Sequence, residues 1–171
     1  MGSMQAYLAS GWFNENQMRI MNKIRDIILE FPEINLFSPY YDGIVLTKDN
    51  DSPEMRRKVF DLDIGTIAFC DLLVAAIDDF EPGTMVELGA AALLCWLIDN
   101  KYKLSYKSEF LYNVPQIIAY TNVSGRGLNV MLQQATWGFA NGEEQLREQL
   151  RRFVNKEKPI DYLSFKRGDF V

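Results

Sequence analysis

The chain of 171 residues contains no histidine and only two cysteines. Without histidine, neither a Ser-His-Asp or Cys-His catalytic arrangement nor an ordinary histidine-based zinc site can form. Proton transfer would then depend on Asp, Glu, Tyr, Lys or water. Carboxylates are the first candidates, because the chain carries 23 acidic residues.

Basic charge and long apolar runs are also scarce. The net charge is −5, which argues against a protein that binds a nucleic acid polymer, since such a protein needs a basic patch. No apolar run reaches the length of a membrane span and no signal peptide is visible, so we expect no membrane partner. Cys70 and Cys95 lie in apolar contexts. They are typical of reduced core residues in a cytoplasmic protein without a disulfide.

The common phosphate-binding motifs are missing as well. The chain has no G-x-G-x-x-G after a strand and no G-x-x-x-x-G-K-[ST], the motifs of dinucleotide-binding and P-loop proteins. Ser124-Gly-Arg-Gly127 is too short for a phosphate loop, and we interpret it as a turn. The sequence therefore disfavours a nicotinamide or P-loop enzyme.

One carboxylate, Glu87, stands out within an otherwise uncharged and largely apolar stretch, Thr84–Ile98. This stretch predicts a helix that is packed on most of its faces. In one interpretation Thr84 and Glu87 form a capping box at the start of the helix. In the other, the helix N-terminus keeps Glu87 ionised at neutral pH, and the carboxylate acts as a nucleophile. An acidic loop, 78–83, precedes the helix.

The pattern along the chain predicts an α/β domain with a mostly parallel sheet. Strands are expected at 5–9, 34–37, 72–77 and 115–121, and helices at 14–31, 54–69, 84–98 and 143–154. The loops after the first strand (10–13) and after the 72–77 strand (78–83) should meet where such sheets bind ligands. The polar segment 38–53 is expected to be a lid that faces the substrate.

A single domain is expected over 4–171. Residues 1–3 have the composition of an expression remnant, 100–113 look like an inserted loop, and 155–171 look like a C-terminal tail. The length of the chain suits one core.

Several motifs occur in the order found in one family. They are Tyr7-Leu-Ala-Ser-Gly-Trp-Phe13, Asp63 with Asp71, Glu81-Pro-Gly-Thr-Met-Val-Glu-Leu-Gly89 and Leu128-Asn-Val-Met131. Together they resemble the nucleoside 2-deoxyribosyltransferases. The resemblance implies a flavodoxin-like, doubly wound fold with a five-stranded sheet flanked by helices. It also implies transfer of 2-deoxyribose from a deoxynucleoside donor to a free nucleobase acceptor, without a metal or organic cofactor.

The resemblance assigns roles to individual residues. Glu87 matches the nucleophile, Tyr7 the residue that orients it, and Asp63 the acid that exchanges a proton with the base. Glu81 stands where the family has an Asp that contacts the sugar. Asn129 and Met131 match contacts that come from an adjacent subunit, which implies a homo-oligomer, a dimer or a hexamer, with shared sites.

Other candidates come from the loops. Gly11, Trp12 and Phe13 follow the first strand and are candidate substrate-binding residues, although the two aromatic side chains could equally close the core. Asp42 is a candidate for contact with the edge of the base. The chemistry expected of this set is a double displacement through a covalent deoxyribosyl-Glu87 intermediate.

Two other functions stay open at this point. One is a hydrolase of deoxynucleosides or deoxynucleotides with the same fold, in which water resolves the intermediate. The other is a catalytically silent nucleotide-binding module. The chain also departs from the family: 100–113 is longer than the usual connection, and the last residue is Val171, where some members end in Tyr.

Overall fold

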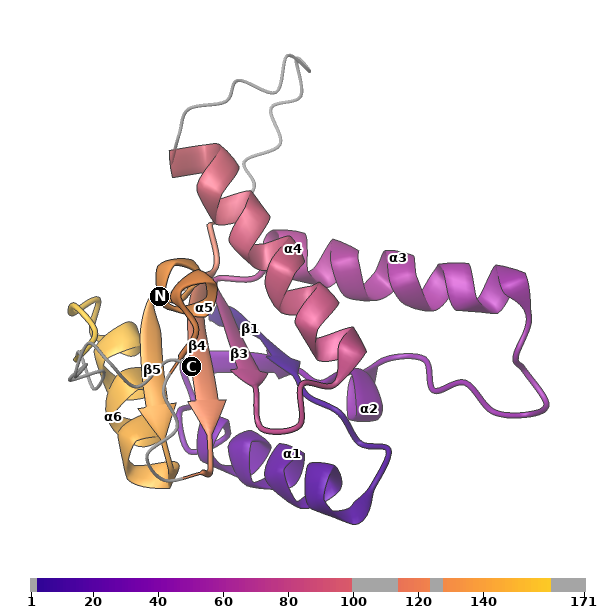
Figure 1. Ribbon diagram of the computed structural model, residues 1–171, viewed down its shortest axis with the longest axis horizontal. Coiled ribbons are helices and arrows are strands. Elements are labelled where there is room, and N and C mark those ends of the chain that lie inside the picture. The colour runs from indigo at the N-terminus through magenta and orange to yellow at the C-terminus, as the bar shows by residue number, and fades with distance from the viewer. Residues whose placement is uncertain (1–2, 100–113, 124–127, 161–171) are drawn as a thin grey trace.

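Short apolar strands alternate with helices along the computed structural model, which describes residues 3–99, 114–123 and 128–160. In these ranges five strands form one parallel sheet in the order β2-β1-β3-β4-β5 (Figure 1). The strands are β1 (Met4–Ala9), β2 (Ile34–Phe37), β3 (Leu72–Ala76), β4 (Gln116–Thr121) and β5 (Gly138–Asn141). This order is that of flavodoxin-like folds, so the predicted fold class is confirmed.

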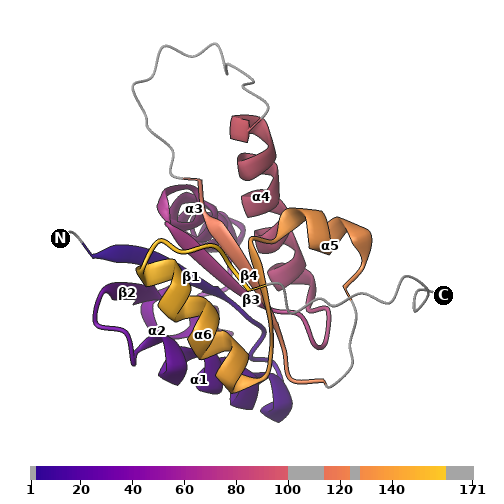
Figure 2. The same cartoon turned by 90° about the vertical axis from the view of Figure 1, so that its left-hand side faces the viewer.

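Helices cover both faces of the sheet (Figure 2). They are α1 (Glu15–Ile28), α2 (Pro39–Asp42), α3 (Pro53–Phe69), α4 (Pro82–Asp99), α5 (Val130–Ala135) and α6 (Glu143–Val154). Helices α1 and α6 pack together on one face, and α3 and α4 pack together on the other. Among the described residues, even α4, with 18 residues, is not apolar enough to cross a membrane.

Alternation along the strands decides which side chains face the catalytic candidates. Ala6 and Leu8 of β1 belong to the core under α1 and α6, whereas Tyr7 and Ala9 point to the core under α3 and α4. In a strand, successive side chains point to opposite faces. Tyr7 is thereby placed on the same side of the sheet as Glu87 of α4.

Some sequence predictions differ from the structure. The sequence pattern located four strands and missed β5 and α5, which occupy 130–141. The predicted loop 38–53 begins with the short helix α2. Of the predicted segments, 100–113, the turn residues 124–127 and the tail residues 161–171 lie outside the described residues. Cys70 and Cys95 do not form a disulfide, as predicted.

Candidate active site

The first turn of α4 is capped by Glu81. Its Oε1 accepts a hydrogen bond from the Gly83 N–H at 2.9 Å, and its Oε2 accepts from the Thr84 N–H at 2.6 Å and the Thr84 hydroxyl at 2.9 Å. These bonds satisfy donors that a helix N-terminus leaves free. Of the two interpretations of Glu87, the capping box with Thr84 is therefore excluded, and the Glu87 side chain takes no part in the cap.

Glu87 instead faces the sheet and pairs with Tyr7. The Tyr7 hydroxyl donates to Glu87 Oε1 at 2.6 Å, across 80 positions of sequence. Burial, then the charge of Glu87, raise the pKa of Tyr7 far above its usual value, so Tyr7 stays a proton donor. Among the described residues, the other oxygen, Glu87 Oε2, has no hydrogen-bond partner. The pair thus fixes the carboxyl group and leaves one oxygen available.

Burial is the main influence on the ionisation of Glu87. It raises the pKa of Glu87 to about 8, with smaller increases from the charges of Asp63 and Glu81, while the Tyr7 hydrogen bond lowers it. Burial therefore favours the protonated form of Glu87. Burial thus acts against the sequence-based expectation that the helix N-terminus keeps Glu87 ionised.

A second carboxyl group, Asp63, approaches this pair from α3. Asp63 is half-buried, and burial raises its pKa to about 6. The negative charge of Asp63 also raises the pKa values of both Tyr7 and Glu87. Within the described ranges Asp63 forms no hydrogen bond or ion pair, so its proton is available for exchange. Two carboxyl groups with raised pKa values in one place are typical of acid–base and nucleophilic sites.

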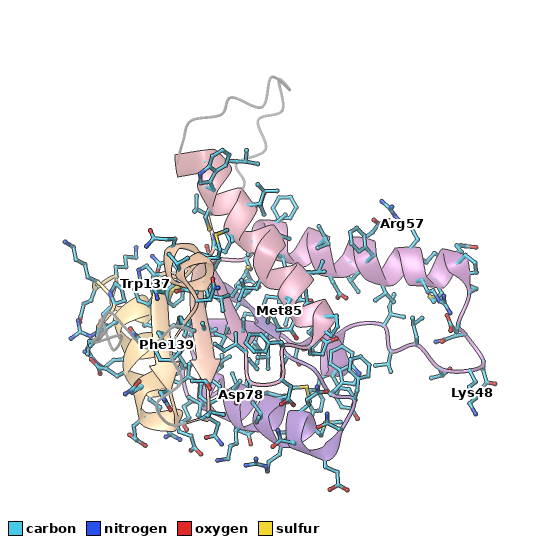
Figure 3. The ribbon with its side chains drawn as sticks, in the orientation of Figure 1. Lys48, Arg57, Asp78, Met85, Trp137 and Phe139 are labelled. Atoms are coloured by element: carbon cyan, nitrogen blue, oxygen red, sulfur yellow. The ribbon has the colours of Figure 1, made fainter. Side chains whose placement is uncertain are left out.

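The predicted meeting of the two loops is confirmed at Gly11. A side-chain carbon placed at Gly11 would lie 2.9 Å from Glu81 Cγ, so the loop after β1 touches the loop after β3. Asp78, labelled in Figure 3, ties the second loop to β4. It accepts hydrogen bonds from the Thr121 hydroxyl and from the Asn122 N–H. The sequence analysis missed this role of Asp78.

Three predicted residues have interactions other than a bond to Glu87. Asn129 caps α5, where its Oδ1 accepts from the Met131 N–H at 2.7 Å. Met131 lines an apolar groove of about 370 Å³ between α4 and α5. Asp42 is the last residue of α2, and its carboxylate accepts a hydrogen bond at 2.8 Å from the N–H of Ser38, which precedes the helix. Within the described part of the chain, no hydrogen bond or ion pair joins these three residues to Glu87.

The described residues hold no group of three or more Cys, Asp or Glu side chains arranged to bind a metal ion. The arrangement present is a carboxyl group held by a tyrosine, a second carboxyl group close by, and two loops that meet beyond the strands. Ligands of doubly wound α/β proteins bind at this edge of the sheet. The fold and the site thus define a flavodoxin-like protein with a carboxylate centre at its switch point.

Within that class, the chain belongs to the nucleoside 2-deoxyribosyltransferase family. The family model for nucleoside 2-deoxyribosyltransferases matches residues 6–99, more than half of the chain. The resemblance found in the motifs is thereby confirmed. The matched range includes Tyr7, Asp63, Glu81 and Glu87. Membership supports an activity of the nucleoside deoxyribosyltransferase type.

Solved structures show the same fold. A 2-deoxyribosyltransferase from the psychrotolerant bacterium Bacillus psychrosaccharolyticus superposes with a TM-score of 0.68 and 23% identity, over 91% of this chain and 98% of that one. A conserved protein from Enterococcus faecalis V583 superposes with a TM-score of 0.64 and 17% identity, over 88% of this chain and 99% of that one. No curated protein sequence matches the chain.

Proposed function

We propose that this protein transfers 2-deoxyribose from a deoxynucleoside to a free nucleobase, with Glu87 as the nucleophile. The main support is the 2.6 Å hydrogen bond from Tyr7 to one Glu87 oxygen, which leaves the other oxygen without a partner among the described residues. A structural carboxylate at a helix start would bond to backbone amides, and here Glu81 has that role. Such a reaction serves the salvage of nucleobases.

In the first half of the reaction, the ionised Glu87 attacks the anomeric carbon of the bound deoxynucleoside. The bond between that carbon and the base nitrogen breaks, and its electron pair leaves with the base. Asp63 gives its proton to the departing base. The product is a deoxyribosyl ester of Glu87, as in retaining glycosidases.

In the second half, a nitrogen of the incoming base attacks the same carbon from the face that the first base left. The ester bond breaks and Glu87 is released as a carboxylate. The proton lost by the incoming base returns to Asp63. Two displacements give retention at the anomeric carbon.

Tyr7 is proposed to keep Glu87 in one rotamer during both steps. Its ring is fully buried and stacks on Phe37, with ring centroids 5.8 Å apart, so the hydroxyl has little freedom. Positioning of this kind lowers the barrier, because less orientation entropy is lost at the transition state.

Assembly into a homo-oligomer with shared sites is also proposed. Leu93 and Trp96 on α4 are 56% and 50% exposed, and Met131 on α5 is 75% exposed. These side chains line the groove between α4 and α5, and apolar surface of this kind marks interfaces. A second copy of the chain would cover the groove. Asn129 and Met131, which form no hydrogen bond with Glu87 among the described residues, would then be available to a neighbouring site.

A single assay tests the transfer. The protein is incubated with deoxyinosine, with and without adenine, and the products are separated by chromatography. Transfer predicts deoxyadenosine only in the presence of adenine. Free deoxyribose formed at equal rates in both samples would show hydrolysis instead, and binding without turnover of any deoxynucleoside would show a silent binding module.

The nucleophile is tested with Glu87→Ala and Glu87→Gln. Both variants should lose turnover by at least about 10⁴-fold, because the covalent step is removed, while the fold persists by circular dichroism. Acid-quenched wild type should gain the mass of one deoxyribosyl group, and neither variant should. Wild-type rates in Glu87→Ala would refute the assignment.

A further inference from the structure

Gly11 is enclosed by two side chains from other parts of the chain. A side-chain carbon at this position would lie 2.7 Å from Gln17 Oε1 and 2.9 Å from Glu81 Cγ. Contacts that short do not occur, so a residue other than glycine would displace one of the two side chains. Gln17 of α1 and Glu81 of the loop before α4 therefore approach each other only because position 11 is glycine.

Gln17 also holds the turn that follows Gly11. Its side-chain Oε1 accepts a hydrogen bond from the Phe13 N–H at 2.9 Å. This bond is not needed to start α1, because Asn14 already caps the helix by accepting from the Gln17 N–H at 2.9 Å. Within the described ranges, the Gln17 amide nitrogen has no hydrogen-bond partner. The side chain of Gln17 thus ties the backbone of Phe13 to the helix.

The turn held in this way carries two stacked aromatic rings. The centroids of Trp12 and Phe13 lie 5.3 Å apart with an interplanar angle of 29°. Trp12 packs against the core under α1 and α6, whereas Phe13 is 71% exposed. An exposed ring fixed on an anchored ring suits a flat aromatic ligand, because stacking depends on a defined ring orientation.

Gln17 also lines a small cavity at the same edge of the sheet. Ser10, Gly11, Asp78, Asp79 and Glu81 are among the other residues around it. Its volume of about 10 Å³ is close to the space of one water molecule. The cavity is therefore no ligand site in itself, and Gln17 fills the space between the aromatic turn and the acidic loop.

We propose that Gln17 is a positioning residue for the nucleobase. It fixes the Trp12–Phe13 pair relative to the Glu81 loop, and through that loop relative to Glu87. The inference rests on the proposed transferase function, and it predicts that Gln17 acts on base binding and not on the chemical step.

The test compares three variants. Gln17→Met keeps the length of the side chain but removes the acceptor for the Phe13 N–H, and Gln17→Glu restores an acceptor oxygen. Asn16→Ala is the matched control, because Asn16 is the preceding, exposed residue of the same helix and its side chain bonds to Arg19. Steady-state rates with varied adenine and saturating deoxyinosine give kcat and KM.

Gln17→Met should raise the KM for adenine about 5- to 10-fold, the effect expected from one lost hydrogen bond, with kcat within about twofold. Gln17→Glu should recover most of that loss, and Asn16→Ala should match wild type. Gly11→Ala should raise the KM as well, and the Gly11→Ala/Gln17→Met double variant should be less than additive because both changes act on one contact.

An unchanged KM in Gln17→Met would overturn the proposal, and so would a fall in kcat and melting temperature without a change in KM, which would indicate a structural role only. The failure of the proposed function looks different, because wild type and Asn16→Ala would then both lack turnover. In that case calorimetry of adenine binding tests the role of Gln17 directly. Weaker binding of adenine to Gln17→Met than to wild type supports that role. Equal binding, or no binding to wild type, overturns it.

Discussion

The two faces of the sheet are built differently. The outer surface of α1 and α6 is charged, and Arg147 of α6 bonds to Glu30 beyond α1 and to Glu144 of its own helix. The outer surface of α4 is largely apolar, with Leu93 and Trp96 each about half exposed. On α3 the exposed Phe60 lies among the ion pairs Arg57–Asp61 and Lys58–Glu54. In Figure 1, α3 and the end of α4 also extend beyond the sheet. One side of the sheet thus presents charged helices to solvent, whereas the other exposes apolar side chains of α4, and Tyr7, Asp63 and Glu87 lie on that second side.

The largest effect is expected where a charge enters the apolar face. Trp96→Glu should raise the dissociation constant of the oligomer by at least about 10³-fold, because a buried Trp at an interface is worth several kcal/mol and a two-fold interface contains it twice. Lys156→Gln makes the same change in charge at the end of α6 and should leave assembly unchanged. Analytical ultracentrifugation measures both variants. A wild-type monomer at micromolar concentration would show that the apolar face has another purpose.

Asp63→Asn should lower kcat/KM by about 10²- to 10³-fold, because general acid catalysis contributes on that order. The pH profile identifies the cause. The reaction needs Glu87 without its proton and Asp63 with its proton. The pKa is about 8 for Glu87 and about 6 for Asp63. The fraction of protein in this form is therefore greatest between pH 6 and pH 8, and wild-type kcat/KM should fall below about pH 6 and above about pH 8.

In Asp63→Asn the fall at high pH should disappear, because no acid remains to lose its proton. Activity should then rise with pH until Glu87 is ionised, somewhat below pH 8, since the charge of Asp63 contributes to the raised pKa of Glu87. A variant that kept the alkaline limb would assign the proton donor to another residue.

Tyr7→Phe should lower kcat about 10- to 100-fold, as expected for a lost hydrogen bond to a charged group. The ring remains and keeps its stacking on Phe37, so the melting temperature should change little. Because the Tyr7 hydrogen bond lowers the pKa of Glu87, its loss should also move the alkaline limb of kcat/KM to higher pH. A loss of activity without that movement would mean that Tyr7 acts on something other than Glu87.

The sequence predicted the parts of the site that depend on local pattern. The 72–77 strand and the meeting of the 10–13 and 78–83 loops follow from periodicity and parallel topology, whereas the pairing of Tyr7 with Glu87 was expected only from the family resemblance. Strand β5 was missed because Gly138–Asn141 is short and follows α5 almost directly. The capping role of Glu81 was missed because Thr84 is a preferred capping residue and glutamate is not.

The remaining errors concern properties that only packing decides. Glu87 was expected to be ionised, but its burial between β1, α3 and α4 raises its pKa to about 8. The 84–98 stretch was expected to be covered on most faces, yet Leu93 and Trp96 are exposed in the single chain. An apolar sequence indicates that a surface becomes buried, but it does not indicate whether the same chain or another copy covers it.

Glu87→Gln should stabilise the protein while it removes activity. The pKa of Glu87 in the folded protein, about 8, lies above its usual value of 4.5, so the folded state resists ionisation. The cost is absent below about pH 4.5 and grows as the pH rises toward 8. Glu87→Gln should therefore be more stable by on the order of 4 kcal/mol at pH 8.5 and equal to wild type at pH 4. Urea unfolding at the two pH values measures the difference, and equal stability at pH 8.5 would show that Glu87 is not desolvated.

The smallest effect is expected on the charged face. Arg147→Ala removes the bonds to Glu30 and Glu144, but these groups are largely open to solvent, where ion pairs contribute little. The melting temperature should fall by at most about 3 °C at low salt, and the difference should shrink in 1 M salt because the charges are then screened. The kcat, KM and oligomeric state should match wild type. A loss of activity in Arg147→Ala would show that the α1 and α6 face takes part in the chemistry, and the division between the two faces would then be wrong.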